Sequence, residues 1–305
     1  MLKKPLIDII GFPMDLGANR RGVDMGPSAL RIAGIKDKLQ NLGYRTKDHG
    51  DVPIKIRENL QTGNPKLKYL AEIVRASKVL AGKVERSLTR KHLPLCIGGD
   101  HSLSIGSIAG VASYCRKNFI NPGIIWIDAH TDINDETTTP SGNIHGMPLA
   151  VALGLGNPQL THLLDFAPKT EPGNCVLIGV RSIDAQEKEI IKKLNLVVYT
   201  MADIDKMGLN AIISRVLERL TKNVSHIHVS FDMDSVDPSV AAGVGTPVLG
   251  GLTYRETHLL MESIAECGCL ASLDIAEINP ILDHQNQSAE FAADLVASAM
   301  GKRIL

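Results

Sequence analysis

The sequence has few cysteines, and their number and spacing argue against two common uses of that residue. Five cysteines are scattered along the 305 residues, and none forms a CxxC pair. An odd number without paired spacing argues against a disulfide framework and against a zinc ribbon. We therefore expect a reducing environment and a cytoplasmic location.

An excess of either charge is also absent. Lys+Arg and Asp+Glu each number 33, so the formal net charge is zero. A chain without a positive balance offers no electrostatic reason to bind nucleic acid or an anionic membrane. We expect neither as a partner.

Long apolar runs are missing as well. No run approaches the eighteen or more apolar residues of a membrane-spanning helix. The start, MLKKPLIDIIGFP, has two lysines before a short apolar stretch, but a signal peptide needs a longer apolar segment and a small-residue cleavage site. We interpret residues 5–12 as a first strand instead.

Short apolar runs typical of strands alternate with segments in which apolar residues recur at helical spacing. Such alternation predicts βαβ units and a parallel sheet. No linker-like segment and no repeat divides the chain, so we expect a single α/β domain over residues 1–305. The expected strands are 6–12, 93–99, 123–129, 175–180, 196–200, 226–232 and 270–277, and the expected helices are 28–42, 67–88, 102–115, 185–194, 208–222, 254–266 and 289–300.

Polar side chains follow four of these strands, at the edge where open α/β sheets bind ligands. The run GIIWI continues into DAHTD, and period-two alternation puts Asp128, His130 and Asp132 on one side. Left alone, these groups would repel and desolvate one another, so we expect a cation between them. Each cluster alone could be a solvated turn or a helix cap. The residues that would meet at one rim are His101, Asp128, His130, Asp132, Asp232, Asp234 and Glu277.

Charge decides how many ions we expect. The four aspartates of this set carry four negative charges, which two divalent ions would neutralise and one would not. Imidazole and carboxylate ligands without cysteine suit manganese better than structural zinc. Two ions about 3.5–4 Å apart can share a bridging water and lower its pKa. We therefore predict two Mn²⁺ ions per chain.

Several motifs resemble the arginase/agmatinase (ureohydrolase) family. They are GGDHS (98–102), DAHTDIN (128–134), FDMDSVDP (231–238) and DIAEINP (274–280), and the stretch GFPMDLGANRRGVDMGPSAL (11–30) extends the resemblance to the start. SGNIHG (141–146) and GVGTPVLGGLTYRE (243–256) are similar to the arginase branch, in its bacterial form. The resemblance implies a three-layer α/β/α domain around an eight-stranded, mainly parallel sheet, a binuclear manganese centre and a homotrimer or homohexamer.

The resemblance also implies roles by position. The metal ligands would be His101, Asp128, His130, Asp132, Asp232 and Asp234. The residues acting in proton transfer would be His145 and Asp132, and Glu277 would hold the guanidinium. The residues around the substrate α-carboxylate would be Asn134, Ser141 and Asn143. The residues around the α-amino group would be Asp184 and Glu187, with Thr246 lining the site. Ser182 stands where animal arginases carry an aspartate.

The implied reaction is hydrolysis of L-arginine to L-ornithine and urea by a hydroxide that bridges the two ions. Agmatinase or another guanidino-compound hydrolase would share the same metal ligands. An arginine-binding protein without catalysis and a mononuclear zinc deacetylase are weaker alternatives. Simpler explanations also exist for single residues: His145 could cap a helix, and Asp184 and Glu187 could be carboxylates favoured at a helix N-terminus.

Overall fold

The computed structural model describes residues 4–303 of the chain. Its strands are β1 (Ile7–Phe12), β2 (Thr46–Asp51), β3 (Leu93–Gly98), β4 (Pro122–Ile127), β5 (Cys175–Val180), β6 (Val197–Thr200), β7 (His226–Asp232) and β8 (Leu270–Ala276). They form one sheet in the order β2-β1-β3-β8-β7-β4-β5-β6, and all neighbouring strands are parallel. The predicted α/β architecture with a parallel sheet is therefore confirmed.

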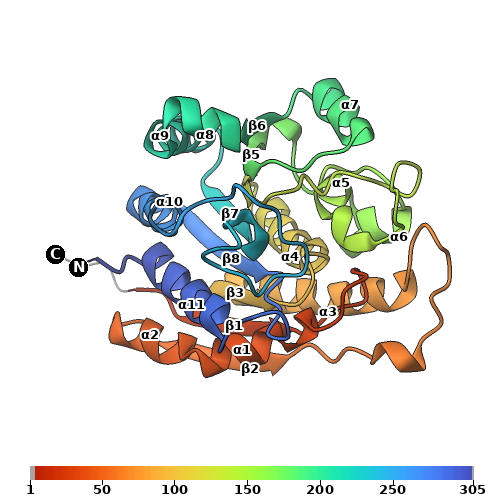
Figure 1. The fold of residues 1–305 in the computed structure, drawn as a ribbon, viewed down its shortest axis with the longest axis horizontal. Coiled ribbons are helices and arrows are strands. Elements are labelled where there is room, and N and C mark those ends of the chain that lie inside the picture. The colour runs from red at the N-terminus through yellow and green to blue at the C-terminus, as the bar shows by residue number, and fades with distance from the viewer. Residues whose placement is uncertain (1–3, 304–305) are drawn as a thin grey trace.

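Helices cover both faces of the sheet, which completes three layers (Figure 1). Those of the described residues are α1 (Gly26–Ile32), α2 (Ile35–Asn41), α3 (Leu70–Thr89), α4 (Leu103–Lys117), α5 (Pro148–Ala152), α6 (Pro158–Thr161), α7 (Ala185–Leu194), α8 (Met201–Met207), α9 (Leu209–Thr221), α10 (Tyr254–Cys267) and α11 (Gln287–Ala299). α2, α11, α10 and α9 pack in succession on one face, and α3, α4 and α5 pack on the other. Within residues 4–303, no helix is both long and apolar enough to cross a bilayer.

The central strands are buried on both faces. Every residue of β1, β3, β5 and β7 is buried, as expected where helices cover both sides of a parallel sheet. This burial explains why the strands were visible in the sequence as nearly continuous apolar runs. All seven strands predicted from those runs are present.

The eighth strand, β2, was not predicted from the apolar pattern. Its sequence is TKDHGD, and its side chains are half-buried or exposed. β2 pairs only with β1 and forms one edge of the sheet, so it has no buried side that would require apolar residues. The family resemblance, in contrast, did imply eight strands.

Two helix predictions need correction. The segment 28–42 is not one helix, because Gly34 adopts a left-handed conformation (φ 76°) that separates α1 from α2. The segment 67–88 becomes helical only at Leu70, since Tyr69 before it is also left-handed (φ 54°). The helix predicted at 208–222 is confirmed as α9, whereas the short helix α8 before it was not predicted.

Candidate metal centre and substrate cavity

The sheet brings the four predicted polar clusters to one rim. β3, β8, β7 and β4 are consecutive neighbours in its centre, and all point the same way. His101 follows β3, Asp128 follows β4, and Glu277 follows β8 directly. Asp232 is the last residue of β7. The prediction that these residues meet is confirmed.

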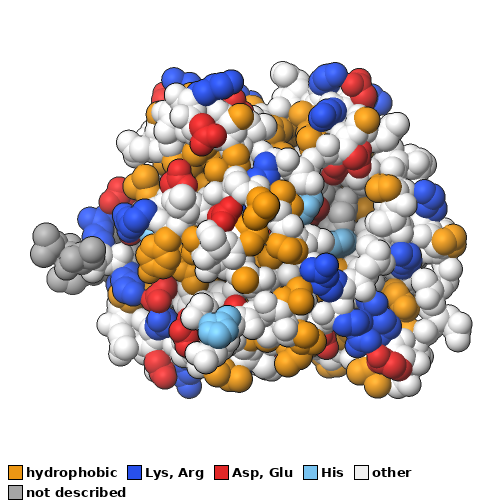
Figure 2. Space-filling view, viewed as in Figure 1, with side chains coloured by type: hydrophobic (Ala, Val, Ile, Leu, Met, Phe, Trp, Pro, Cys, Tyr) orange, Lys and Arg blue, Asp and Glu red, His pale blue; other side chains and the backbone are white. Residues whose placement is uncertain are grey.

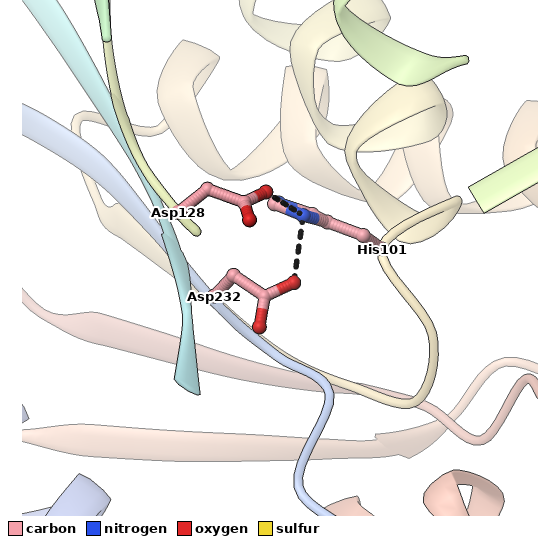
Figure 3. A group of neighbouring side chains, drawn as sticks. All are labelled: His101, Asp128 and Asp232. Atoms are coloured by element: carbon pink, nitrogen blue, oxygen red, sulfur yellow. Dashed lines mark ion pairs between the residues drawn. The ribbon is translucent and has the colours of Figure 1, made fainter. Parts of the chain in front are cut away.

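Three carboxylates converge on one nitrogen of His101, and Figure 3 draws two of them, Asp128 and Asp232. Its Nδ1 lies 3.1 Å from an oxygen of Asp128, 3.1 Å from one of Asp132 and 3.0 Å from one of Asp232. Despite these distances, this buried nitrogen has no partner in hydrogen-bonding geometry within the described residues. Ligand atoms of His101, Asp128 and Asp232 lie close enough to one another to hold one cation, and Asp132 adjoins this group.

A second group lies beside the first. Nδ1 of His130 is 3.1 Å from an oxygen of Asp234 and 3.4 Å from Oδ1 of Asp128. Asp128 belongs to both groups, one oxygen on each side. The arrangement suits two neighbouring ions that share one carboxylate. Five of the six predicted ligands belong to the two groups, and Asp132 lies beside the first.

Without a cation, the buried aspartates of this site repel one another, and the pKa values of the site residues are strongly shifted. Burial and the neighbouring Asp128 raise the pKa of Asp132 to about 7. Burial would lower the pKa of His130, but Asp234 and Asp128 raise it to about 12. Carboxylates with nitrogen ligands and no thiolate match the preference of manganese. The donor set, the orphaned His101 nitrogen and the charge conflict therefore all fit a pair of divalent ions.

Two residues that the sequence did not single out hold the ligands in place. The hydroxyl of Ser230 lies 2.8 Å from Nε2 of His101, so that the other ring nitrogen faces the carboxylates. Trp126 donates its Nε1–H to Asp128 at 3.0 Å and stacks on the His101 ring. Both lie on a strand two positions before a ligand, Trp126 before Asp128 and Ser230 before Asp232. Side chains two positions apart on a strand lie on the same face of the sheet, so the positions two residues before each ligand could have been identified from the sequence.

A cavity of about 230 Å³ opens above the ligand groups. On the surface, pale blue histidine atoms are visible in a hollow near the middle of the face shown in Figure 2. The predicted substrate residues all line this cavity, together with Ser182; they are Asn134, Ser141, Asn143, Asp184, Glu187 and Thr246. The structure therefore brings the predicted substrate residues next to the predicted ligands.

His145 and Glu277 form a pair at the boundary with an adjoining cavity that both residues line. Nδ1 of His145 lies 2.9 Å from Oε1 of Glu277, and the backbone N–H of His101 donates to the same oxygen at 3.0 Å. Burial would lower the pKa of His145, but the bond to Glu277 and nearby carboxylates raise it to about 9. The helix-cap explanation of His145 is wrong, because the cap residue of α5 is Met147.

The other oxygen of Glu277 has no partner among the described residues of the protein. Oε2 is buried and has no hydrogen-bond donor in the part of the chain that the structure describes. Gly245 borders it so closely that a Cβ on that glycine would lie 2.4 Å from Oε2. A buried, unpaired carboxylate oxygen is costly unless a cationic donor satisfies it.

At the far end of the cavity, Asp184 and Glu187 form a capping box on α7. Glu187 also accepts a bond from the Thr131 hydroxyl at 2.7 Å, and Asp184 accepts one from the Asn134 amide at 2.9 Å. Both acids thus lie at the N-terminus of a helix and cap it, as the simpler explanation predicted. Their position on the cavity wall remains compatible with a second role toward a ligand.

Comparison with known proteins identifies the family. A family model described as "Arginase family" matches residues 6–301. The chain belongs to the arginase family. The arginases of Bacillus caldovelox and Bacillus subtilis are each 47% identical to it, over 98% of this chain and 99% of theirs. The crystal structure of the Bacillus caldovelox arginase superposes with a TM-score of 0.95 at 46% identity, covering 99% of this chain and 100% of that one.

The same fold also occurs with a different enzyme name. A formimidoylglutamase from Bacillus subtilis superposes with a TM-score of 0.78 at only 23% identity, covering 97% of this chain and 86% of that one. The fold of the arginase family alone therefore does not decide the substrate. That decision depends on the residues that line the cavity.

Proposed function

We propose that this member of the arginase family hydrolyses L-arginine to L-ornithine and urea. The observation that carries the proposal is Oε2 of Glu277, a buried acceptor without a protein donor beside the ligand groups. A guanidinium is a cation with N–H donors in a planar fork and matches such a carboxylate. The full-length similarity to arginases supports the same substrate.

The metal centre in this proposal consists of two Mn²⁺ ions held by His101, Asp128, His130, Asp132, Asp232 and Asp234. When bound, such a pair supplies a water of lowered pKa as the nucleophile. The distances around His101 and His130 and the sharing of Asp128 support two sites.

The protein groups then divide the remaining tasks. Glu277 orients the guanidinium so that its carbon faces the metal ligands. Because the substrate is already oriented when it binds, the reaction does not have to meet that entropic cost at the transition state. Asp132 takes part in proton transfer from the nucleophile. His145, whose raised pKa keeps it protonated at neutral pH, gives a proton to the departing ornithine amine.

At the other end of the substrate, Ser141 and Asn143 bind the α-carboxylate together with Asn134. Asp184 and Glu187 surround the α-amino group, and Thr246, which donates to Asp234 at 2.8 Å, lines the site between. Ser182 and Asp184 line the same cavity. Ser182 has no charge, so Asp184 is the acid of this pair that binds the α-amino group. We also propose one domain over residues 1–305, a cytoplasmic homotrimer or homohexamer, and no nucleic-acid or membrane partner.

Substrate choice tests this proposal directly. Agmatine is arginine without its α-carboxylate, so it leaves the donors at the far end without their charged acceptor. Sites built around polar groups reject analogues that lack the partner by up to about 10⁴-fold. We expect kcat/KM for arginine to exceed that for agmatine by at least roughly 100-fold. Urea release after manganese loading measures it, and equal rates would replace the arginase proposal by an agmatinase one.

Gly245→Ala should lower kcat/KM for arginine roughly 10- to 100-fold, because the new Cβ would lie 2.4 Å from Oε2 of Glu277 and displace the carboxylate. Metal content should stay at the wild-type level, since the atoms nearest to the new Cβ belong to Glu277 and Val23 and not to a proposed ligand. Gly82→Ala is the matched control: a Cβ there, within α3, meets no atom within 4 Å. An unchanged kcat/KM in Gly245→Ala would contradict the role given to Glu277.

A further inference from the structure

The cavity wall carries many negative charges, although the proposed substrate has a negatively charged α-carboxylate. Five carboxylates line it, and among residues 4–303 no lysine or arginine does. Two metal ions would compensate the aspartates near them, but not Asp184 and Glu187 at the far end. In the proposed function these two acids face the α-amino group, so the α-carboxylate meets only neutral donors in the wall, and a positive charge close to those donors would favour it.

Lys68 stands where that charge is required. It lies in the segment before α3, and its Nζ donates to Oδ1 of Asn143 at 3.0 Å and to Oδ1 of Asn19 at 3.1 Å. Asn143 is 5% exposed and lines both cavities. In the part of the chain that the structure describes, no Asp or Glu forms a salt bridge with Lys68.

The bond from Lys68 fixes the orientation of the Asn143 amide. An ammonium group has only donors, so it must face the oxygen of that amide and never its nitrogen. The two N–H donors of Nδ2 are then on the other side, away from Lys68. The amide that the proposed function assigns to the substrate carboxylate is thereby held with its donors available.

The backbone holds Lys68 to the same loop. Its N–H donates to the carbonyl of Gly142 at 3.1 Å. Gly142 has a left-handed φ of 74°, and a Cβ on it would lie 1.8 Å from the carbonyl oxygen of Pro65. The two segments therefore pack backbone against backbone, which places the half-buried Lys68 beside Asn143.

We propose that Lys68 is a specificity-determining, positioning residue: its ammonium orients the Asn143 amide and supplies the positive charge that favours substrates with an α-carboxylate. This inference rests on the proposed function. It extends that function to a residue outside the cavity wall, which acts through Asn143 and not on the reacting atoms.

The test compares substrates with and without the carboxylate in Lys68→Met, which keeps the length of the side chain and removes its charge. KM for arginine should rise roughly tenfold, as expected for loss of a charged hydrogen bond at a half-buried site, while kcat changes less than about twofold. KM for agmatine should stay unchanged. Lys68→Arg should restore most of the preference, because it keeps the charge.

Lys66→Met is the matched control. Lys66 is on the same segment, but its Nζ donates to the backbone carbonyl of Thr139 at 2.7 Å and not to a side chain in the cavity. The ratio of the two KM values should stay at the wild-type level in this variant. Equal losses for arginine and agmatine in Lys68→Met would show a merely structural role and overturn the proposal.

Binding without turnover separates this inference from the proposed function. In calorimetric titrations of the manganese-loaded protein, L-ornithine should bind roughly tenfold more weakly to Lys68→Met than to wild type, and putrescine, its analogue without the carboxylate, equally to both. Wild type that fails to release urea from arginine would refute the proposed function alone. Unchanged ornithine affinity in Lys68→Met would refute the role of Lys68 alone.

Discussion

Asp128→Asn should remove both metal ions from the protein and reduce activity by at least roughly 10³-fold, because no activated water can form without them. Asp128 is the one residue common to both ligand groups. Its Oδ2 faces His101 and its Oδ1 faces His130, at 3.1 and 3.4 Å. An amide in its place keeps the volume but offers one weaker oxygen ligand instead of two charged ones.

Two single-site variants are the controls for this result. His101→Asn and His130→Asn each remove a ligand that belongs to one group, so each should retain close to one ion per chain. Metal analysis of the purified proteins, with thermal unfolding before and after manganese loading, measures the difference. In Asp128→Asn, manganese should no longer raise the unfolding temperature, because metal binding stabilises only a fold that can bind it. Two retained ions in Asp128→Asn would contradict the shared-ligand arrangement.

The centre of the fold could be read from the sequence because its strands are buried on both faces. Burial forces apolar runs such as CVLIGV (175–180), and polar residues directly after such runs mark the carboxyl end of the sheet. The clusters around His101, Asp128 and Asp232 were recognisable for that reason. β2 was not recognisable, since an edge strand with half-exposed side chains has no apolar pattern to show.

Other features depend on contacts between segments distant in the chain. Lys68 is 75 residues from Asn143, and nothing in the helix-like pattern around it indicates that bond. Gly245 matters because Glu277 lies beside it, and the role of that glycine follows only from tertiary proximity. Backbone conformation is hidden as well. Asp132 and Glu277 both adopt positive φ, 48° and 63°, which residues with side chains rarely do. Such strain is typical of functional sites, where the surrounding structure must maintain it.

His145 is the residue for which the structure gives the sharpest test of a catalytic role. It contacts Glu277 and is not a member of either metal group. Its backbone N–H donates to the carbonyl of Gly17 at 3.1 Å, and this contact ties the loop to the N-terminal segment whatever side chain is present. His145→Asn should therefore keep the fold and the full metal content.

Its kcat should nevertheless fall by about 10²–10⁴-fold, the usual contribution of a general acid or base. Asparagine can still donate a hydrogen bond to Glu277, but it cannot gain or lose a proton. A raised pKa means that the protonated imidazole is present below that pKa and is lost as the pH rises through it. Because the pKa of His145 is raised to about 9, the difference between wild type and variant should be large throughout the neutral range and should shrink above that pH. Steady-state kinetics between pH 6 and about 10 measure this profile. An unchanged kcat at every pH, with normal manganese content, would reduce His145 to a structural partner of Glu277.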